Sequence, residues 1–392
     1  MANSDLVFVR QEISESKPAP STVRGPIAWA RENLFSTPSD ALMTILAILF
    51  LWWATPPVFN FLIGHAVWPG ADVTGADCRI ESAGACWAYI WDRMNFFIYG
   101  FYPRDPAWVD QEGFFALVMS YWRVNLVFLI GIVLLVPLLW PDLPYKATNA
   151  LLFFVVFPVI VFFLLNGGVF GLPEVPTEQW GGLTVTLIIG LVGIVVSLPL
   201  GIVLALGRQS KLPIIKSLCI MFIEIWRAVP LITVLFMASV MLPLFAPPDV
   251  TVDKLVRALV GVSLFSAAYM AEVVRGGLQA LPRGQYEAAA AMGLNYWKSM
   301  VFIILPQALK HVIPGIVNSF ISLFKDTSLV SIVGIFDLLN TVQSANSDLN
   351  WGSENQAVTG YLFAALVFWI FCFSMSRYSI FMERRLDTGH RS

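Results

Sequence analysis

Apolar runs of about 20 residues recur along this chain, and they limit its fold more than any other feature. A helix rises about 1.5 Å per residue, so such a run has the length needed to cross the hydrocarbon of a bilayer. The predicted spans are residues 41–63, 114–140, 148–168, 183–207, 216–246, 256–275, 312–336 and 358–378. The sequence therefore predicts an all-α membrane protein with about eight transmembrane helices. The fifth run is too long for one straight crossing, so a tilt, a kink or an interfacial helix is expected there.

The composition agrees with a bilayer environment. Hydrophobic residues make up 57% of the 392 residues and charged residues 13%, whereas soluble proteins carry roughly a quarter charged residues. The net charge of −2 gives no indication of a nucleic-acid partner. Residues 1–40 are polar and show no cleavable signal peptide, so the first span is expected to direct insertion.

Lys and Arg alternate between loops. Loops 169–182 and 337–357 contain neither residue, whereas the alternate loops contain several. These basic residues are Arg208, Lys211 and Lys216, then Arg275, Arg283, Lys298 and Lys310, then Arg377, Arg384, Arg385 and Arg391. The positive-inside rule therefore predicts that the N-terminal segment 1–40 and the C-terminus are cytoplasmic, and that loop 64–113 is periplasmic.

The predicted periplasmic loop contains Cys78 and Cys86, which are eight residues apart. In an oxidising compartment this pair is expected to form a disulfide, and two unpaired thiols are the alternative. The same loop is rich in Trp, Tyr and Phe, which is typical of a segment at the membrane interface.

Motifs for catalysis are missing from the sequence. Neither a phosphate-binding G-x-x-x-x-G-K-[ST] loop nor a G-x-G-x-x-G fingerprint occurs, and His65, His311 and His390 lack metal-site spacing. We therefore expect no catalytic residue, no metal and no cofactor in this chain, and an energy source elsewhere.

The predicted cytoplasmic loop 276–311 reads as helix, break, helix. The run Glu287–Ala291 has high helix propensity, and Gly293 can adopt the left-handed conformation that ends a helix. Asn295 can cap the next helix, and Pro306 makes its continuation costly.

These residues resemble the coupling loop of permease subunits in binding-protein-dependent ABC importers. That family carries Glu-Ala-Ala, a glycine four residues later and Ile-x-Leu-Pro ten residues beyond the glycine. The matching residues are Glu287, Ala288, Ala289, Gly293, Ile303, Leu305 and Pro306. The resemblance implies that the loop docks on an ATPase subunit, and an ordinary Ala-rich connector is the alternative.

The resemblance extends over residues 181–385, which are similar to the five-helix core of polar amino-acid permeases of the type I importer fold. Residues 41–168 look like the three-span extension of the M-type subunit of general L-amino-acid permeases. The resemblance implies a homologous permease partner in a heterodimer, two ATPase subunits that bind ATP and magnesium, and a periplasmic amino-acid-binding protein. It also implies location in the bacterial inner membrane and an amino-acid substrate.

Ionisable and hydroxyl residues inside the spans are candidates for lining the pore or contacting substrate, because such groups are costly in lipid. They are Glu224, Arg227, Glu272, Lys325, Asp326, Thr327 and Ser328. Glu224 and Arg227 are three residues apart and are expected to pair with each other, with substrate contact as the alternative. For Lys325 and Asp326, an internal ion pair is the alternative to lining the pore. An ion-coupled secondary transporter is the competing function, although it leaves the Glu-Ala-Ala loop unexplained.

Overall fold

The computed structural model describes residues 25–108, 110–111, 113–140, 142–169, 171–245, 247 and 252–386. These residues form helices and two isolated β-bridges. Residues 1–24 of the predicted cytoplasmic segment and Ala246 of the fifth predicted span lie outside the described residues, as do Arg391 and His390. The chain divides into two units, residues 1–66 and 67–392, and each is described by itself.

The first unit contains α1 (Pro26–Asn33), α2 (Pro38–Phe59) and a π-helical turn, η2 (Asn60–Gly64). A capping box at Thr37 begins α2. The Thr37 side chain accepts a hydrogen bond from the Asp40 amide, and the Asp40 side chain accepts one from the Thr37 amide. Pro38 occupies the first turn, where a missing amide hydrogen costs nothing. No residue of α2 is buried within the first unit, although the helix is strongly apolar.

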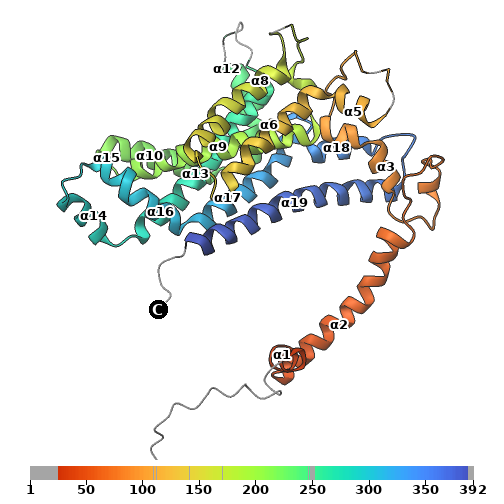
Figure 1. The fold of residues 1–392 in the computed structure, drawn as a ribbon, viewed down its shortest axis with the longest axis horizontal. Coiled ribbons are helices and arrows are strands. Elements are labelled where there is room, and N and C mark those ends of the chain that lie inside the picture. The colour runs from red at the N-terminus through yellow and green to blue at the C-terminus, as the bar shows by residue number, and fades with distance from the viewer. Residues whose placement is uncertain are drawn as a thin grey trace, which may run out of the picture. The chain divides into compact units, whose positions relative to one another are not determined.

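The second unit, shown with its helices labelled in Figure 1, contains the remaining elements. Before the predicted core they are η3 (Asp77–Arg79), α3 (Trp87–Asp92), α4 (Met94–Tyr99), α5 (Phe114–Ser120), α6 (Trp122–Leu139), α7 (Lys146–Leu151), η4 (Leu152–Val156), α8 (Phe157–Asn166) and η5 (Thr177–Gln179). The first elements of the predicted core are α9 (Gly182–Arg208), α10 (Pro213–Ala228), α11 (Leu231–Phe236), η6 (Met237–Met241), α12 (Leu242–Phe245) and α13 (Lys254–Ala280). The last are α14 (Arg283–Ala291), α15 (Tyr296–Ser299), η7 (Met300–Ile304), α16 (Leu305–His311), α17 (Ile313–Asp326), η8 (Thr327–Val333), α18 (Leu338–Ala345) and α19 (Glu354–Leu386).

The predicted spans correspond to helices long and apolar enough to cross a membrane. Within the described residues seven such helices occur, and an eighth span exists if one bent pair counts as a crossing. The prediction of an all-α membrane protein with about eight spans is confirmed. The second predicted span is shorter than expected, because the chain breaks at Tyr121 between α5 and α6.

The fifth predicted span is the bent pair. Helix α10 ends at Ala228, α11 begins at Leu231, and the two axes differ by 102°. Pro230 lies between them in an extended conformation and disfavours a helical conformation at Val229. The expected irregularity of this long run is therefore a sharp bend.

Small residues allow the core helices to approach closely. Helix α9 packs along α13, and a Cβ atom added at Gly201 would lie 2.7 Å from Met270 of α13. Several other residues on the facing surfaces are buried and small, including Ser197 of α9 with Ala267 and Ala271 of α13. In lipid, such close backbone approach replaces the hydrophobic drive that holds helices together in water.

One end of the second unit is a compact folded cap, at the right in Figure 1. Residues 67–105 fold against residues 334–359, and we call this region the cap end. Cys78 and Cys86 are joined in a disulfide, and both are fully buried. The amide of Cys86 donates to the Thr359 hydroxyl at 2.9 Å. Tyr89 and Phe97 are completely buried in the same cluster.

Backbone carbonyls fix the position of the cap. The Arg79 guanidinium donates to the carbonyl oxygens of Leu349, Asn350 and Gly352 at 2.8–3.1 Å. In addition, the Trp351 indole donates to Asp92 at 2.9 Å. Because these bonds join segments about 270 residues apart in sequence, they close the cap over the ends of α18 and α19.

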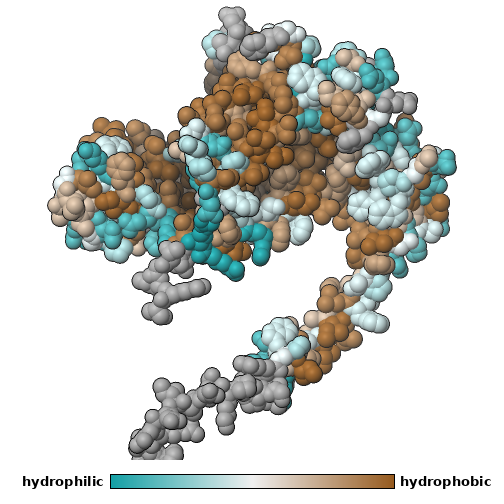
Figure 2. Space-filling view, in the orientation of Figure 1, coloured by the Kyte–Doolittle hydropathy of each residue, from teal (hydrophilic) through white to brown (hydrophobic). Residues whose placement is uncertain are grey.

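The opposite end carries α14 and α15, at the left in Figure 1, and we call residues 208–213 with 281–311 the coupling end. In Figure 2, hydrophobic residues gather on the surface over α6, α8 and α9, while more polar residues occupy the cap and the region of α14. An apolar belt between two polar ends is the distribution expected of a membrane-spanning unit.

Candidate functional site

The predicted coupling loop is a helix, a glycine turn and a second helix. Helix α14 covers the Glu-Ala-Ala sequence and ends at Ala291. Gly293 has a φ of +73°, the left-handed conformation that the sequence predicts for it. The amide of Leu294 donates to the Ala289 carbonyl and that of Gly293 to the Ala290 carbonyl, so the turn satisfies the end of α14. Asn295 then caps α15 by accepting from the Lys298 amide at 2.9 Å.

Pro306 does not stop the second helix, which corrects the expected break there. The chain runs from α15 through the π-helical turn η7 into α16, whose first turn contains Pro306. A π-helical turn widens the helix, so the proline ring fits without its usual clash with the preceding turn.

Polar contacts attach α14 to its neighbours. The Tyr286 hydroxyl donates to the Leu278 carbonyl of α13 at 3.2 Å, and the Gln285 and Gln307 side chains are hydrogen bonded at 3.2 Å. Ala289 is buried, and a Cβ atom at Gly277 of α13 would lie 2.5 Å from the Ala308 carbonyl of α16. The loop therefore follows the end of α13 as one packed piece.

The other side of the loop is exposed. Glu287, Ala288 and Pro306 face outward, while Ile303 and Leu305 are half-buried. Large apolar residues are also exposed here, namely Met292, Tyr296, Trp297, Val301 and Phe302. A group of exposed apolar residues at a polar end of a protein is typical of an interaction surface.

Three arginines and two glutamates meet where α9, α10 and α13 reach the coupling end, and we call them the arginine–glutamate cluster. They are Arg208 of α9, Glu224 and Arg227 of α10, and Glu272 and Arg275 of α13. Arg208 lies 3.0 Å from Glu224 and 2.7 Å from Glu272. Glu272 also lies 2.7 Å from Arg275 and 3.8 Å from Arg227. A single carboxylate thus contacts three guanidinium groups from three helices.

This cluster corrects the expected pair of Glu224 with Arg227. Within the described residues, each of the two forms its ion pair with another helix. The reason is tertiary: Arg208 at the end of α9 reaches Glu224, while Arg227 turns toward Glu272 and lies 5.6 Å from the Tyr269 ring. Two ion pairs between helices, Arg208 with Glu224 and Arg227 with Glu272, thus replace the weak pair expected within α10.

Arg208 and Arg275 were not predicted to belong to this cluster, because both stand where predicted cytoplasmic loops begin. Helix α13 continues to Ala280, beyond the predicted end at residue 275. The i, i+3 spacing of Glu272 and Arg275 is the signal that could have identified the second of them.

Lys325, Asp326, Thr327 and Ser328 lie where α17 changes into the 3₁₀ helix η8. Lys325 is exposed, Asp326 and Ser328 are half-buried and Thr327 is buried. The hydroxyls of Thr327 and Ser328 donate to the carbonyls of Phe324 and Lys325 at 2.8 and 2.9 Å. In the part of the chain that the structure describes, no ion pair joins Lys325 to Asp326.

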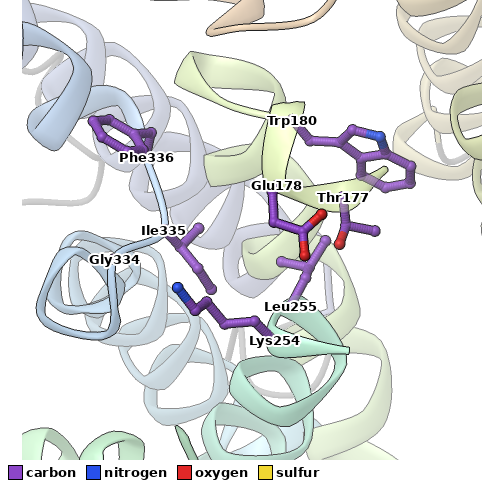
Figure 3. Close-up of a pocket in the computed structure, with 8 residues that line it drawn as sticks. All are labelled: Thr177, Glu178, Trp180, Lys254, Leu255, Gly334, Ile335 and Phe336. Atoms are coloured by element: carbon purple, nitrogen blue, oxygen red, sulfur yellow. The ribbon is translucent and has the colours of Figure 1, made fainter. Parts of the chain in front are cut away.

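Two cavities were considered as a substrate site. Figure 3 shows the first, where Lys254 of α13 extends toward the backbone at Gly334 and the Glu178 carboxylate of η5 lies near Thr177 and Leu255. Its volume of about 20 Å³ suffices for a water molecule and not for an amino acid. The second has a volume of about 640 Å³, and apolar side chains of α6, α8, α9 and α13 form most of its wall. Neither suits a ligand that carries both a carboxylate and an ammonium group.

Comparison with known proteins identifies the family. Residues 197–388 match the family described as binding-protein-dependent transport system inner membrane component. The chain is also 52% identical over 373 residues to the inner membrane amino-acid ABC transporter permease protein YhdY of Escherichia coli, covering 95% of this chain and 96% of that protein. The chain belongs to this family of ABC importer permeases. Its members are non-catalytic membrane subunits, so the predicted permease is confirmed and the secondary-transporter alternative is set aside.

Two further similarities were found. The chain is 41% identical to the glutamate/glutamine/aspartate/asparagine transport system permease protein BztC of Rhodobacter capsulatus, over 99% of this chain and all of that protein. A crystal structure of an amino acid ABC transporter with histidines is 27% identical, with a TM-score of 0.46, and covers 52% of this chain and 92% of that one.

Proposed function

We propose that this permease imports amino acids, including glutamate, glutamine, aspartate and asparagine, and that it forms half of the pathway in a heterodimer with a homologous permease. The observation that carries the proposal is its similarity along nearly the whole chain to two amino-acid permeases. The unsuitable cavities of this subunit support a pathway shared with a second subunit.

The coupling loop is the proposed contact with one of two partner ATPase subunits, which bind ATP and magnesium. The residues of the loop that form this contact or support it by packing are Glu287, Ala288, Ala289, Gly293, Ile303, Leu305 and Pro306. The exposed apolar residues of the loop support it, since an ATPase surface would cover them. A periplasmic binding protein delivers the amino acid at the opposite end.

The proposed orientation places both termini and the coupling end in the cytoplasm. An ion pair between Arg385 of α19 and Asp142 supports it, because the two predicted cytoplasmic segments then lie on one side. The cap end is then periplasmic, where the disulfide of Cys78 and Cys86 is stable. The proposed division is a three-span extension, residues 41–168, and a permease core, residues 181–385.

Lys325, Asp326, Thr327 and Ser328 are the proposed substrate-contacting residues of this subunit. An exposed ammonium group within a span is too costly to face lipid, so Lys325 faces the pathway or the second permease. Together Lys325 and Asp326 offer opposite charges to the carboxylate and ammonium groups that every amino acid carries.

Uptake of labelled amino acids into proteoliposomes containing the complete importer tests this function. We expect uptake to require the binding protein and ATP, to stop when ATP hydrolysis by the partner is disabled, and to be unaffected by an ionophore. Uptake that collapses with the ionophore and continues without ATP would contradict the proposal.

The coupling contact is tested with Gly293→Asp, which places a charge at the turn of the proposed docking surface. We expect normal membrane insertion and loss of uptake. Gly293→Ala and Gly284→Ala form a matched pair, because neither new Cβ atom has a neighbour within 4 Å and only Gly293 has a positive φ. Strain of about 1 kcal/mol should lower uptake for Gly293→Ala and leave Gly284→Ala unchanged. Equal uptake by wild type and Gly293→Asp would refute the contact.

Substrate contact is tested by Lys325→Ala, with Lys211→Ala at the exposed loop after α9 as control. Loss of a charged partner should raise the KM for uptake about tenfold in the first variant and leave it unchanged in the second. An unchanged KM with normal assembly would argue for a packing role of Lys325.

A further inference from the structure

We propose that the arginine–glutamate cluster is a positioning device that transmits movement of the coupling loop through α13 to the bend between α10 and α11, with Glu272 as its centre. The inference rests on the proposed function, since it requires a coupling loop moved by an ATPase. It assigns Glu224, Arg227 and Glu272 to the conformational change, in place of the substrate contact considered from sequence.

Helix α13 links the coupling loop to Glu272. Glu272 lies eight residues before the end of α13, which corresponds to about 12 Å of helix. Beyond it, α14 and α16 clamp the last turns of α13 through Tyr286 and the tight contact of Gly277 with the Ala308 carbonyl. A displacement of α14 is therefore passed to Glu272 along a single packed helix and is not lost in a flexible linker.

Glu272 contacts arginines at the ends of two other helices. Arg227 is the second-last residue of α10, and the 102° bend follows directly. Arg208, which binds both Glu224 and Glu272, is the last residue of α9. The ends of α9 and α10 and the coupling-side part of α13 are thus joined through one carboxylate.

The surroundings of the cluster strengthen its ion pairs and its charge count allows them to rearrange. Apolar neighbours such as Ile223, Ala271 and Val274 are completely buried, which lowers the local dielectric and strengthens the ion pairs. The Glu272 side chain is 16% exposed, whereas that of Arg227 is 36% exposed and its contact is the longest at 3.8 Å. With three positive charges against two negative ones, one guanidinium is always incompletely paired, and here it is Arg227. Exchange of partners around Glu272 can then accompany a change in the α10–α11 bend without leaving this carboxylate unpaired.

The test uses the complete reconstituted importer with Glu272→Gln, and Asp142→Asn as a control that removes an exposed ion pair at the same side of the bundle. Maximal uptake, the KM for the amino acid and the ATP hydrolysed per amino acid are measured. Because the change breaks a largely buried ionic centre, we expect Glu272→Gln to lower maximal uptake about tenfold with ATP hydrolysis nearly unchanged. The KM should stay within about twofold of wild type, since the substrate contacts remain intact. Asp142→Asn should resemble wild type in all three quantities.

The remaining outcomes are also decisive. An unchanged ratio of ATP to amino acid in Glu272→Gln would overturn the inference, and a raised KM with an unchanged ratio would make Glu272 a substrate contact. If Glu272→Gln does not assemble, Arg227→Gln takes its place and should still raise the ratio of ATP to amino acid. Glu272→Asp keeps the carboxylate and should give a ratio close to that of wild type. If uptake by the wild-type importer did not require ATP and the binding protein, the proposed function itself would be refuted.

Discussion

The cap end and the coupling end are held by different kinds of interaction. At the cap end a disulfide, hydrogen bonds from Arg79 to backbone carbonyls and completely buried aromatic side chains fix the chain. At the coupling end, ion pairs join three helices, and large apolar side chains remain exposed on the loop. Covalent and close-packed contacts have one favourable arrangement, whereas a carboxylate among three guanidinium groups can exchange partners without being left unpaired.

From this difference we infer that the cap end keeps its shape during transport and that the coupling end changes. Changes at the cap end should alter local stability and leave coupling intact, whereas changes in the arginine–glutamate cluster should alter coupling.

Gly75→Ala should open the cap. A Cβ atom at this buried position would lie 1.8 Å from the Asn350 carbonyl oxygen, which is backbone and cannot move aside. We expect a loss of at least about 3 kcal/mol in the free energy of local opening, measured by hydrogen exchange of the cap amides. As control, Gly70→Ala meets only the end of the Val73 side chain and should exchange like wild type. Wild-type protection in Gly75→Ala would show that the cap is less rigid than the comparison requires.

Asp337 should make the stability of the cap end depend on pH. Burial raises the pKa of its carboxyl from 3.8 to about 6, although the amides of Leu339 and Asn340 donate to it and act in the opposite direction. The folded state therefore holds the proton more tightly than the unfolded chain. The contribution of Asp337 to stability is therefore expected to be fully present below about pH 4 and to fall by up to about 3 kcal/mol as the pH rises through about 6.

The measurement is thermal unfolding of the purified permease between pH 4 and pH 7, with Asp337→Asn for comparison. The asparagine keeps an oxygen for capping α18 and carries no titratable proton, so its curve should be flatter over this range. Identical slopes for the two proteins would assign the pH dependence to other groups.

Loss of the disulfide through paired Cys78→Ser and Cys86→Ser substitutions should destabilise the cap by about 2–3 kcal/mol, as expected for a loop of this length. Faster hydrogen exchange in residues 67–105 with an unchanged ratio of ATP to amino acid is the expected result. A changed ratio would mean that the cap takes part in coupling and would weaken the division drawn above.

The smallest effect is expected for the pair of Arg385 with Asp142. Both side chains are solvent-exposed, so solvent and salt screen their attraction. Arg385→Gln should leave thermal stability and uptake unchanged within error. A clear loss of uptake would show that ion pairs at this side matter even outside the arginine–glutamate cluster.

Much of the candidate site could be predicted because its signals are local. The left-handed turn at Gly293 and the cap at Asn295 depend on neighbours within a few residues, and both occur as expected. The pairing of Glu224 could not be predicted, because helix geometry makes Arg227 a suitable partner and only the packing of α9 brings Arg208 nearer. The π-helical turn before Pro306 also depends on packing, since a proline alone predicts a break.

The sequence by itself determined that this protein lies in a membrane, about how many spans it has and which permease family it belongs to. The length of apolar runs, the charge of loops and the spacing of motifs are properties of short stretches of chain. Only the tertiary structure decided the 102° bend, the carbonyl clamp of Arg79 on the cap and the convergence of three arginines on Glu272. These features join residues from distant parts of the chain, and their partners are chosen by how the helices pack and not by the order of the residues.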